Sequence, residues 1–429
     1  MDPRRVSCVF FVLIGVALSG TACTSPRPVP EPATRPSGAL VDVDGAEALA
    51  SERRAALATA AEPGPEPGPE PRSARVHERA EPEPAVLSVH QEAHEDGPTT
   101  YDSRDEDPGF AFTAAPSDVY TVAGEFEPVQ ALVLAVADDA LELIPTFVEI
   151  ITAAQREARV VVLYSTEATL ESLETALEEA HVELLDVEFE RVALDSAWIR
   201  DYGPVFAMTT SGDFRIIDTR YYEARPKDDI VPTRVGDLWG FAVSRPPLVS
   251  EGGNLLVDGH GRCVVSDEVL NYNNAWDISE LTSVYASYFG CTDVTVLPAL
   301  AGEGTGHVDM FVTITGPGEA IVGAYVDGDD KENAERLDES AALLKAAGFS
   351  VRRVPMPTNR DGNFRSYTNA LAVNGSVLIP IYTDDRRHEQ RAFEVFEKAY
   401  PGRRLIPIDA TELIQWSGSV HCLTLTVNR

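Results

Sequence analysis

Cys422 is the residue of this sequence best suited to act as a nucleophile. It lies in a short Gly-Ser-Val-His-Cys-Leu-Thr stretch, residues 418–424, close to the C-terminus. The alternation over residues 423–427 predicts a terminal β-strand. A nucleophilic thiol needs a base, and the adjacent His421 would point to the opposite face of such a strand. We therefore expect the base to come from elsewhere in the chain.

His307 is the best candidate for that base. It lies two positions before Asp309, in a stretch that is rich in glycine. On a strand the two side chains would project from the same face, which predicts an imidazole and a carboxylate side by side. The alternative is an exposed strand on which the histidine is only capped by its neighbour. We expect His307, rather than His421, to serve Cys422.

Three further stretches carry polar groups where a strand would be apolar. Arg200 and Asp201 are adjacent between aromatic residues, and burying them is costly for stability alone; the alternative is a surface ion pair at a turn. Glu251 precedes two glycines, which suggests a bulge or a close approach of two backbones, unless the string is a plain turn. Asn369 lies in an apolar stretch and is a candidate buried polar group, unless it only marks the end of a strand.

A Cys–His pair with two nearby carboxylates suits a planar cationic substrate. A guanidinium has five N–H donors and stays protonated in water. Two carboxylates, Asp201 and Asp309, can bind these donors in a bidentate manner and offset the cost of removing the cation from water. The sequence contains no coherent set of zinc or calcium ligands, so we expect no metal and no cofactor.

The segments that must position these residues alternate between groups of strands and single helices. Apolar spacing predicts helices at 139–156, 170–180, 277–289, 331–347 and 387–399. It predicts strands or extended segments at 131–136, 160–164, 182–185, around 198, 214–218, 254–257, 294–297, 307–315, 320–323 and 351–354, and a hairpin at 367–382 that turns at Asn374-Gly375. This grouping argues against a doubly wound parallel sheet. It favours an α/β fold of mixed sheets in repeated β–β–α–β units.

The N-terminal region predicts export. Residues 1–23 have a basic start, a short apolar run and small residues, which are typical of a signal peptide. The residues before Cys23 resemble a bacterial lipobox, so we expect Cys23 to be lipidated and to anchor the protein to a membrane of the bacterial envelope. The alternative is ordinary secretion with an incidental cysteine. Residues 24–112 are rich in Pro, Glu and Ala and predict a disordered tether, which leaves residues 113–429 as the catalytic domain.

The charge of the chain excludes one class of protein, and its cysteine content limits the possible disulfides. The chain has 429 residues and a formal net charge of −34, which excludes a general nucleic-acid binder because such a protein needs a basic face. An acidic surface favours encounters with cationic ligands, although solubility outside the cell is the simpler cause. Cys263 and Cys291 could form a disulfide or remain two buried thiols. Cys422 is expected to be free.

Five short motifs, in this order along the chain, resemble those of the agmatine deiminase / Porphyromonas-type peptidylarginine deiminase family. They are Trp198-Ile-Arg-Asp-Tyr-Gly-Pro204, Glu251-Gly-Gly-Asn254, Gly306-His-Val-Asp-Met310, Tyr367-Thr-Asn369 and Gly418-x-x-His-Cys-x-Thr424. Gly124-Glu-Phe-Glu-Pro128 resembles the usual opening of that family. The family belongs to the guanidine-modifying superfamily, so the resemblance implies a five-bladed, pseudo-symmetric α/β propeller, the pentein fold.

The resemblance also implies a role for each matching residue. Cys422 would be the nucleophile and His307 the general acid and base. Asp201 and Asp309 would bind the guanidinium, and Asn369 would shape the site. The residues expected to line the substrate channel or bind the substrate are Trp198, Glu251, Asn254 and Arg225. The implied reaction passes through a covalent thioether and converts a guanidinium into a ureido group and ammonia.

The natural substrate and the oligomeric state stay open at this point. Export favours arginine or peptidylarginine, which would give citrulline. Glu223 stands where a second arginine would be expected, which argues against recognition of a carboxylate and keeps agmatine, with N-carbamoylputrescine as the product, as the alternative. A further alternative is an inactive, surface-tethered protein that binds cationic ligands. A papain-like protease is not favoured, because here His307 precedes Cys422.

Overall fold

The computed structural model describes residues 111–428, apart from 119, 210–211 and 327. All these residues fall within one compact unit. The predicted signal peptide, Cys23 and almost the whole predicted tether lie outside the described residues. A search of the described part found no helix long and apolar enough to cross a membrane.

Five sheets form the described fold, and each contains the same core of three strands. The first strand of this core is antiparallel to the second, and the second is parallel to the third. The strands, sheet by sheet, are β1 Tyr120–Val122, β5 Val205–Thr209, β6 Phe214–Ile217 and β7 Ala242–Ser244; β8 Leu256–Val257, β9 Arg262–Ser266 and β10 Asp293–Leu297; β11 Val312–Gly316, β12 Glu319–Ala324 and β13 Ser350–Pro355; β14 Leu371–Val373, β15 Ser376–Ile381 and β16 Arg404–Asp409; and β17 Thr424–Asn428, β2 Val129–Val136, β3 Arg159–Tyr164 and β4 Val187–Arg191.

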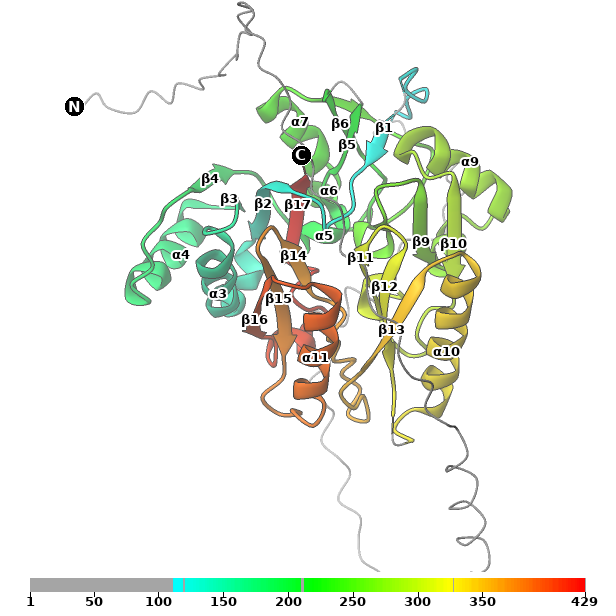
Figure 1. The fold of residues 1–429 in the computed structure, drawn as a ribbon. Helices are drawn as coiled ribbons and strands as arrows, with labels where there is room; N and C mark the ends of the chain where they lie inside the picture. The colour runs from blue at the N-terminus through cyan, green and yellow to red at the C-terminus, as the bar shows by residue number, and fades with distance from the viewer. Residues whose placement is uncertain (1–110, 119, 210–211, 327, 429) are drawn as a thin grey trace, which may run out of the picture. The chain divides into compact units, whose positions relative to one another are not determined.

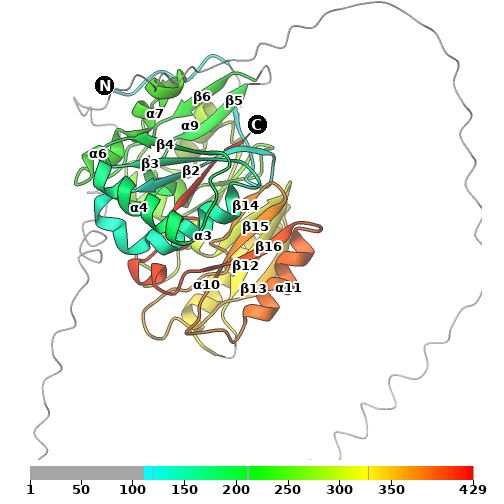
Figure 2. The same ribbon diagram turned by 90° about the vertical axis from the view of Figure 1, so that its left-hand side faces the viewer.

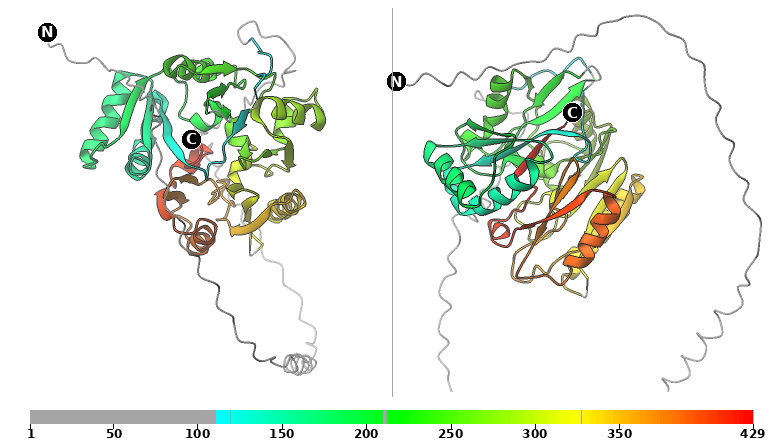
Figure 3. Two further views of the ribbon diagram at one scale, coloured as in Figure 1. Left: turned by 45° about the horizontal axis from the view of Figure 1, so that its top comes forward. Right: turned by 60° about the vertical axis from the view of Figure 1, so that its left-hand side comes forward.

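Helices connect the parallel strands, as a parallel pair requires. The longer ones are α3 Ile144–Ala154, α4 Glu167–Glu179, α7 Val231–Trp239, α9 Ile278–Phe289, α10 Lys331–Ala346 and α11 Glu389–Ala399. The short ones are η1 Asp138–Leu143, α5 Ile199–Tyr202, α6 Pro226–Asp229, η2 Gly252–Asn254, α8 Glu268–Tyr272, η3 Val308–Met310 and η4 Leu413–Trp416. The sheets surround a common centre with the longer helices outside (Figure 3), and α3 and α4 lie beside β2 to β4 (Figure 2). The repeated β–β–α–β unit predicted from the sequence is confirmed.

The last strand of the chain completes the sheet that the first part of the domain begins. β17 pairs antiparallel with β2, with Thr424 opposite Leu134 and Val427 opposite Ala131, and Figure 1 shows the red C-terminal strand beside the cyan one. Four of its five residues are buried, because both faces of this strand are covered. The segment that carries Cys422 is therefore fixed by a strand pairing between the two ends of the domain.

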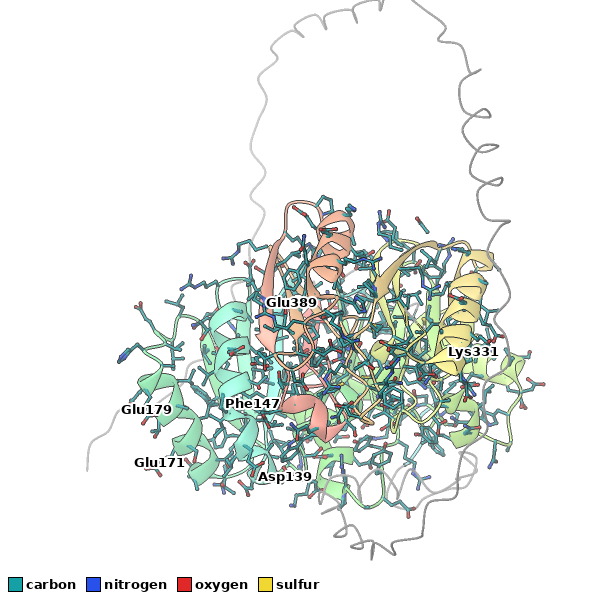
Figure 4. All side chains as sticks on the ribbon, turned by 90° about the horizontal axis from the view of Figure 1, so that it is seen from below. Asp139, Phe147, Glu171, Glu179, Lys331 and Glu389 are labelled. Carbon is teal, nitrogen blue, oxygen red and sulfur yellow. A yellow bond between two sulfur atoms is a disulfide. The ribbon has the colours of Figure 1, made fainter. Side chains whose placement is uncertain are left out.

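Local sequence signals set the ends of the helices. The side chain of Asp277 accepts a hydrogen bond from the backbone N–H of Glu280, the side chain of Glu280 accepts one from the backbone N–H of Asp277, and Gly290 ends α9 with a φ of 74°. These are a capping box and a left-handed C-terminal glycine. The exposed Glu171 and Glu179 of α4 lie at the outer edge of the domain (Figure 4). The exposed side of α4 therefore carries acidic side chains.

A disulfide joins Cys263 and Cys291. Cys263 lies in β9, and Cys291 follows α9 directly. Both are buried in a core cluster that also contains Leu281 and Tyr285. The structure therefore selects the disulfide from the two alternatives that the sequence left open.

Some predicted elements were wrong. The strand expected at 182–185 is a loop in which Leu185 is 60% exposed, and β4 begins only at Val187. The strand expected at 307–315 begins at Val312, and the extended segment expected near 198 contains the short helix α5 instead. The segment expected at 254–257 does hold strand β8, which follows the short helix η2. These errors share a cause, because apolar or polar pattern alone does not distinguish a strand from a tight turn that packs against another segment.

Candidate active site

The five motifs occupy equivalent places in the fold. Each lies in the segment that leads into the first strand of a sheet core: α5 before β5, η2 before β8, η3 before β11, residues 366–370 before β14, and residues 417–423 before β17. The sheets surround a common centre (Figure 3), and contacts of α5 with η2 and β17, of η2 with η3, and of Asn369 with Cys422 bring these segments together. The repeat of the fold, rather than proximity in sequence, brings the chemistry together.

Cys422 is a buried free thiol at this meeting point. Its Sγ lies 3.4 Å from Asn369 Nδ2 and 4.0 Å from Asp309 Oδ2. Burial, and then the charges of Asp309 and Asp201, raise the pKa of this thiol well above its ordinary value. The free site therefore holds a neutral thiol that a cationic substrate would activate by cancelling the negative charge around it.

His307 is buried and paired with two carboxylates. Its Nε2 lies 2.8 Å from Glu251 Oε2, and its Nδ1 lies 3.5 Å from Asp201 Oδ1. Burial lowers the pKa of His307, but the charges of Glu251 and Asp201 outweigh it and raise that pKa well above its ordinary value. The ring is thus held as an imidazolium, the form that can protonate a leaving group.

The arrangement of His307 and Asp309 differs from the predicted strand. His307 precedes the 3₁₀ turn η3, and Asp309 lies inside it. Their side chains have different partners, because Asp309 Oδ2 lies 2.7 Å from His421 Nδ1. The two residues still reach one centre, because the tight turn aims them at it from one short segment.

Asp201 and Asp309 each keep one buried carboxylate oxygen, Oδ1, without a hydrogen-bond partner among the described residues. Both carboxylates act electrostatically on Cys422. Buried acceptors are normally satisfied, because an unsatisfied one costs about 1–3 kcal/mol. Two such oxygens beside one thiol form a cradle for a ligand with several N–H donors and a positive charge.

Two glycines allow this close packing. A Cβ on Gly252 would lie 2.0 Å from the backbone oxygen of Arg200, and a Cβ on Gly253 would lie 2.5 Å from His307 Nδ1 and 2.6 Å from Asp201 Oδ1. The close approach that the sequence suggested after Glu251 is therefore confirmed. Glycine is needed there because other side chains would occupy the space of the site.

Glu251 is a partner of His307 in this structure. It is 2% exposed, and the hydroxyls of Tyr222 and Tyr272 also hydrogen bond to it. Sequence reasoning placed Glu251 in the substrate channel and missed both tyrosines. A Glu–Gly–Gly string indicates a tight turn, but no local pattern announces which distant hydroxyls will reach the carboxylate.

Asn369 and Asn254 hold backbone groups of the site. Asn369 is fully buried, and its Oδ1 accepts a hydrogen bond of 2.9 Å from the backbone N–H of His421. Asn254 Oδ1 accepts from the backbone of Ser266 at 2.7 Å and of Val308 at 3.3 Å. Asn369 thus fixes the turn that carries Cys422, and Asn254 fixes the start of η3.

Trp198 and Arg225 lie around this centre. Trp198 is 6% exposed, and a Cβ on Gly418 would lie 2.4 Å from its ring, so the indole packs against the turn that carries Cys422. Arg225 donates to Ser196 Oγ at 3.3 Å and to the Tyr221 hydroxyl at 3.2 Å. The guanidinium of Arg225 therefore has protein partners in the free site.

His421 belongs to the site, contrary to the prediction from strand geometry. His421 and Cys422 precede β17 in a turn, so the alternation of a strand does not apply to them. The ring of His421 lies between Asp309 and Glu125, with its Nε2 2.8 Å from Glu125 Oε2. Sequence reasoning also missed Glu125, although its motif, residues 124–128, was noticed.

A search of the described residues found no group of three or more His, Cys, Asp or Glu side chains able to hold a metal ion. The carboxylates of the site face a histidine or an arginine, or keep an oxygen without a hydrogen bond among the described residues. The geometry brings together a buried thiol, a histidine paired with carboxylates and two carboxylates that each keep one oxygen without a hydrogen bond, an arrangement expected of a hydrolase that uses a cysteine.

Comparison with known proteins agrees with this class. Residues 121–427 match the model of the Porphyromonas-type peptidyl-arginine deiminase family, and the chain belongs to that family. The agmatine deiminase of Pseudomonas aeruginosa is 27% identical over 283 residues, which cover 56% of this chain and 76% of that relative. The agmatine deiminase of Ectopseudomonas mendocina is 27% identical over 301 residues, which cover 60% and 80%.

The solved structures support the fold. The agmatine deiminase of Enterococcus faecalis superposes with a TM-score of 0.66 and 19% identity, over 74% of this chain and the whole of that one. The predicted α/β fold is thus confirmed, and the five sheets of β–β–α–β units are consistent with the five blades of a pentein. The chain is a hydrolase that acts on carbon–nitrogen bonds of linear amidines.

Proposed function

We propose that this protein deiminates a small guanidinium substrate, with agmatine as the first candidate. The observation that carries the proposal is the pair of buried carboxylates, Asp201 and Asp309, next to the buried thiol of Cys422, each with one oxygen that accepts no hydrogen bond among the described residues. A guanidinium supplies both the N–H donors and the positive charge that this cradle requires. The agmatine deiminases among the relatives support the same chemistry.

The residues of the site account for each step of the proposed reaction. Binding of the cation between Asp201 and Asp309 lowers the pKa of Cys422, and the resulting thiolate adds to the guanidinium carbon. His307 donates its proton to the departing amino group, which leaves as ammonia and gives a cationic thioether. The neutral His307 then removes a proton from a water molecule, which attacks the same carbon. The thiolate then leaves and takes up the proton of the added hydroxyl, which yields the ureido product and restores the thiol of Cys422.

Two observations favour agmatine over a substrate that carries a carboxylate. Arg225, the cation expected to bind the substrate, already donates to Ser196 and Tyr221 and lies over the ring of Tyr222 at 5.7 Å. Glu223, which stands where a second arginine would be expected, lies 3.9 Å from Arg220 and supplies no positive charge for a carboxylate. The second candidate is peptidylarginine or arginine, which the family description and the predicted export signal favour.

A substrate panel tests the proposal. Purified wild type would be given agmatine, free arginine and arginyl peptides in separate reactions, with ammonia and ureido product measured in each. We expect turnover of agmatine and none in a folded Cys422→Ala variant. Turnover restricted to arginyl peptides would select the second candidate. Binding of a guanidine without release of ammonia from any of the three would refute the deiminase proposal and favour a binding protein.

A further inference from the structure

A buried row of charged side chains continues from the cradle away from the thiol. Asp309 Oδ2 lies 2.7 Å from His421 Nδ1, and His421 Nε2 lies 2.8 Å from Glu125 Oε2. Arg200 is bound to the other oxygen of Glu125 and lies 3.4 Å from the backbone oxygen of His421. The side chains of Asp309, His421 and Arg200 are at most 8% exposed, and that of Glu125 is 19% exposed.

The geometry fixes the protonation of His421. Each ring nitrogen faces a carboxylate oxygen, and a carboxylate can only accept. Both nitrogens must therefore carry hydrogen, so the ring is an imidazolium. Two anions, Glu125 and Asp309, then balance two cations, Arg200 and His421, and this balance is what makes the burial of all four groups tolerable.

We propose that His421, held by Glu125, is a positioning residue that fixes Asp309 for the substrate. The hydrogen bond from His421 occupies Oδ2 of Asp309, so Oδ1 is the oxygen left to face the guanidinium. This inference rests on the proposed function, because it assigns a role to groups behind the guanidinium cradle. It also gives a role to His421, which is next to the nucleophile in sequence but forms no hydrogen bond with its thiol among the described residues.

The charges around His421 predict how the row responds to pH. Asp309 from η3, Glu125 from the segment before β2, Arg200 from α5 and the neighbouring thiol of Cys422 face it. Burial and Arg200 lower the pKa of His421, whereas Glu125 and Asp309 raise it and prevail. Burial raises the pKa of Glu125, but Arg200 and His421 outweigh this and lower that pKa to about 2.

Removal of the charge of Glu125 therefore has a specific signature. In Glu125→Gln the shape is kept and one of the two anions that hold the proton on His421 is lost. The pKa of His421 falls below that of the wild type, and the imidazolium is lost as the pH rises through this lower value. A neutral ring has one N–H instead of two, and its hydrogen bond to Asp309 loses the charge that strengthens it, so binding weakens at high pH and is kept at low pH. Above the new pKa the loss grows by about tenfold per pH unit.

The test measures binding, so that it does not depend on turnover. The Kd of agmatine would be determined by calorimetry between about pH 6 and pH 9. The parent protein is Cys422→Ala, and the three variants add Glu125→Gln, Glu125→Asp or Glu127→Gln to it. Glu127→Gln is the control, because Glu127 lies in the same segment as Glu125 and forms no ion pair with any described residue. We expect a high-pH loss in Glu125→Gln only, with Glu125→Asp close to its parent because it keeps the charge.

The outcomes separate the two proposals. A Glu125→Gln profile parallel to its parent, or a Glu125→Asp variant weaker than Glu125→Gln at high pH, would mean that shape rather than charge matters and would overturn the inference. If Glu125→Gln does not fold, two other measurements test the inference: the pH profile of Glu125→Asp and the histidine signals of the parent in nitrogen NMR. A neutral His421 at neutral pH in the parent would also overturn the inference. Tight binding of agmatine without turnover by the wild type would refute only the proposed function.

Discussion

Gly253→Ala is the change that most directly tests the geometry of the site. Gly253 lies between His307 and Asp201, and its φ is outside the left-handed region. Alanine therefore fits the backbone, and the whole effect comes from one methyl group. That methyl would lie 2.5 Å from His307 Nδ1 and 2.6 Å from Asp201 Oδ1, where favourable contacts need about 3.5 Å.

The magnitude follows from this overlap. The imidazole and the carboxylate must each retreat by roughly 1 Å, and a displacement of that size in a catalytic group costs on the order of 100-fold in rate. The movement also lengthens the 2.8 Å contact between His307 and Glu251. Forcing one extra methyl into a packed site costs about 1–3 kcal/mol of unfolding free energy. We expect a folded protein with a melting temperature a few degrees lower and a large loss of kcat.

The assay compares Gly253→Ala with a matched control, Gly304→Ala. Gly304 lies three positions before His307, and a Cβ there would meet no atom within 4 Å. Steady-state ammonia release from agmatine and thermal unfolding would be measured for both variants. Gly304→Ala should keep the wild-type kcat, KM and melting temperature. A threefold change in kcat corresponds to less than ~1 kcal/mol of activation free energy. If the kcat of Gly253→Ala stays within about threefold of the wild type, the assigned positions of His307 and Asp201 are refuted.

Two other predictions concern protonation and the disulfide. Burial raises the pKa of Asp201 to about 7, and only its ionised form attracts a guanidinium, so kcat/KM for agmatine should fall as the pH is lowered through this region; a flat profile down to about pH 5 would contradict the assignment. Loss of the bond between Cys263 and Cys291, which closes a loop of 28 residues, should cost roughly 3–4 kcal/mol of unfolding free energy. Denaturant unfolding of the Cys263→Ser/Cys291→Ser protein measures this, and the kcat of the folded variant should stay unchanged because the bond lies outside the site.

The sequence determined the chemical groups and the repeating unit. Cys422, His307, Asp201 and Asp309 were selected because a thiol, an imidazole and two carboxylates are the residue types that act on a guanidinium. The helices were predicted well where caps and apolar spacing agree, as in α9 and α10. These properties are local, since they depend on side-chain chemistry and on hydrogen bonds within a few residues.

The partners of these groups were decided by the tertiary structure alone. His421 was dismissed because the sequence placed it on a strand, whereas a turn before β17 aims it at Asp309. Glu125 reaches that histidine across 296 positions of sequence, and Tyr222 and Tyr272 reach Glu251 in a similar way. Such contacts depend on how five sheets meet at one centre. No periodicity within a segment contains that information, because it belongs to the packing of segments against one another.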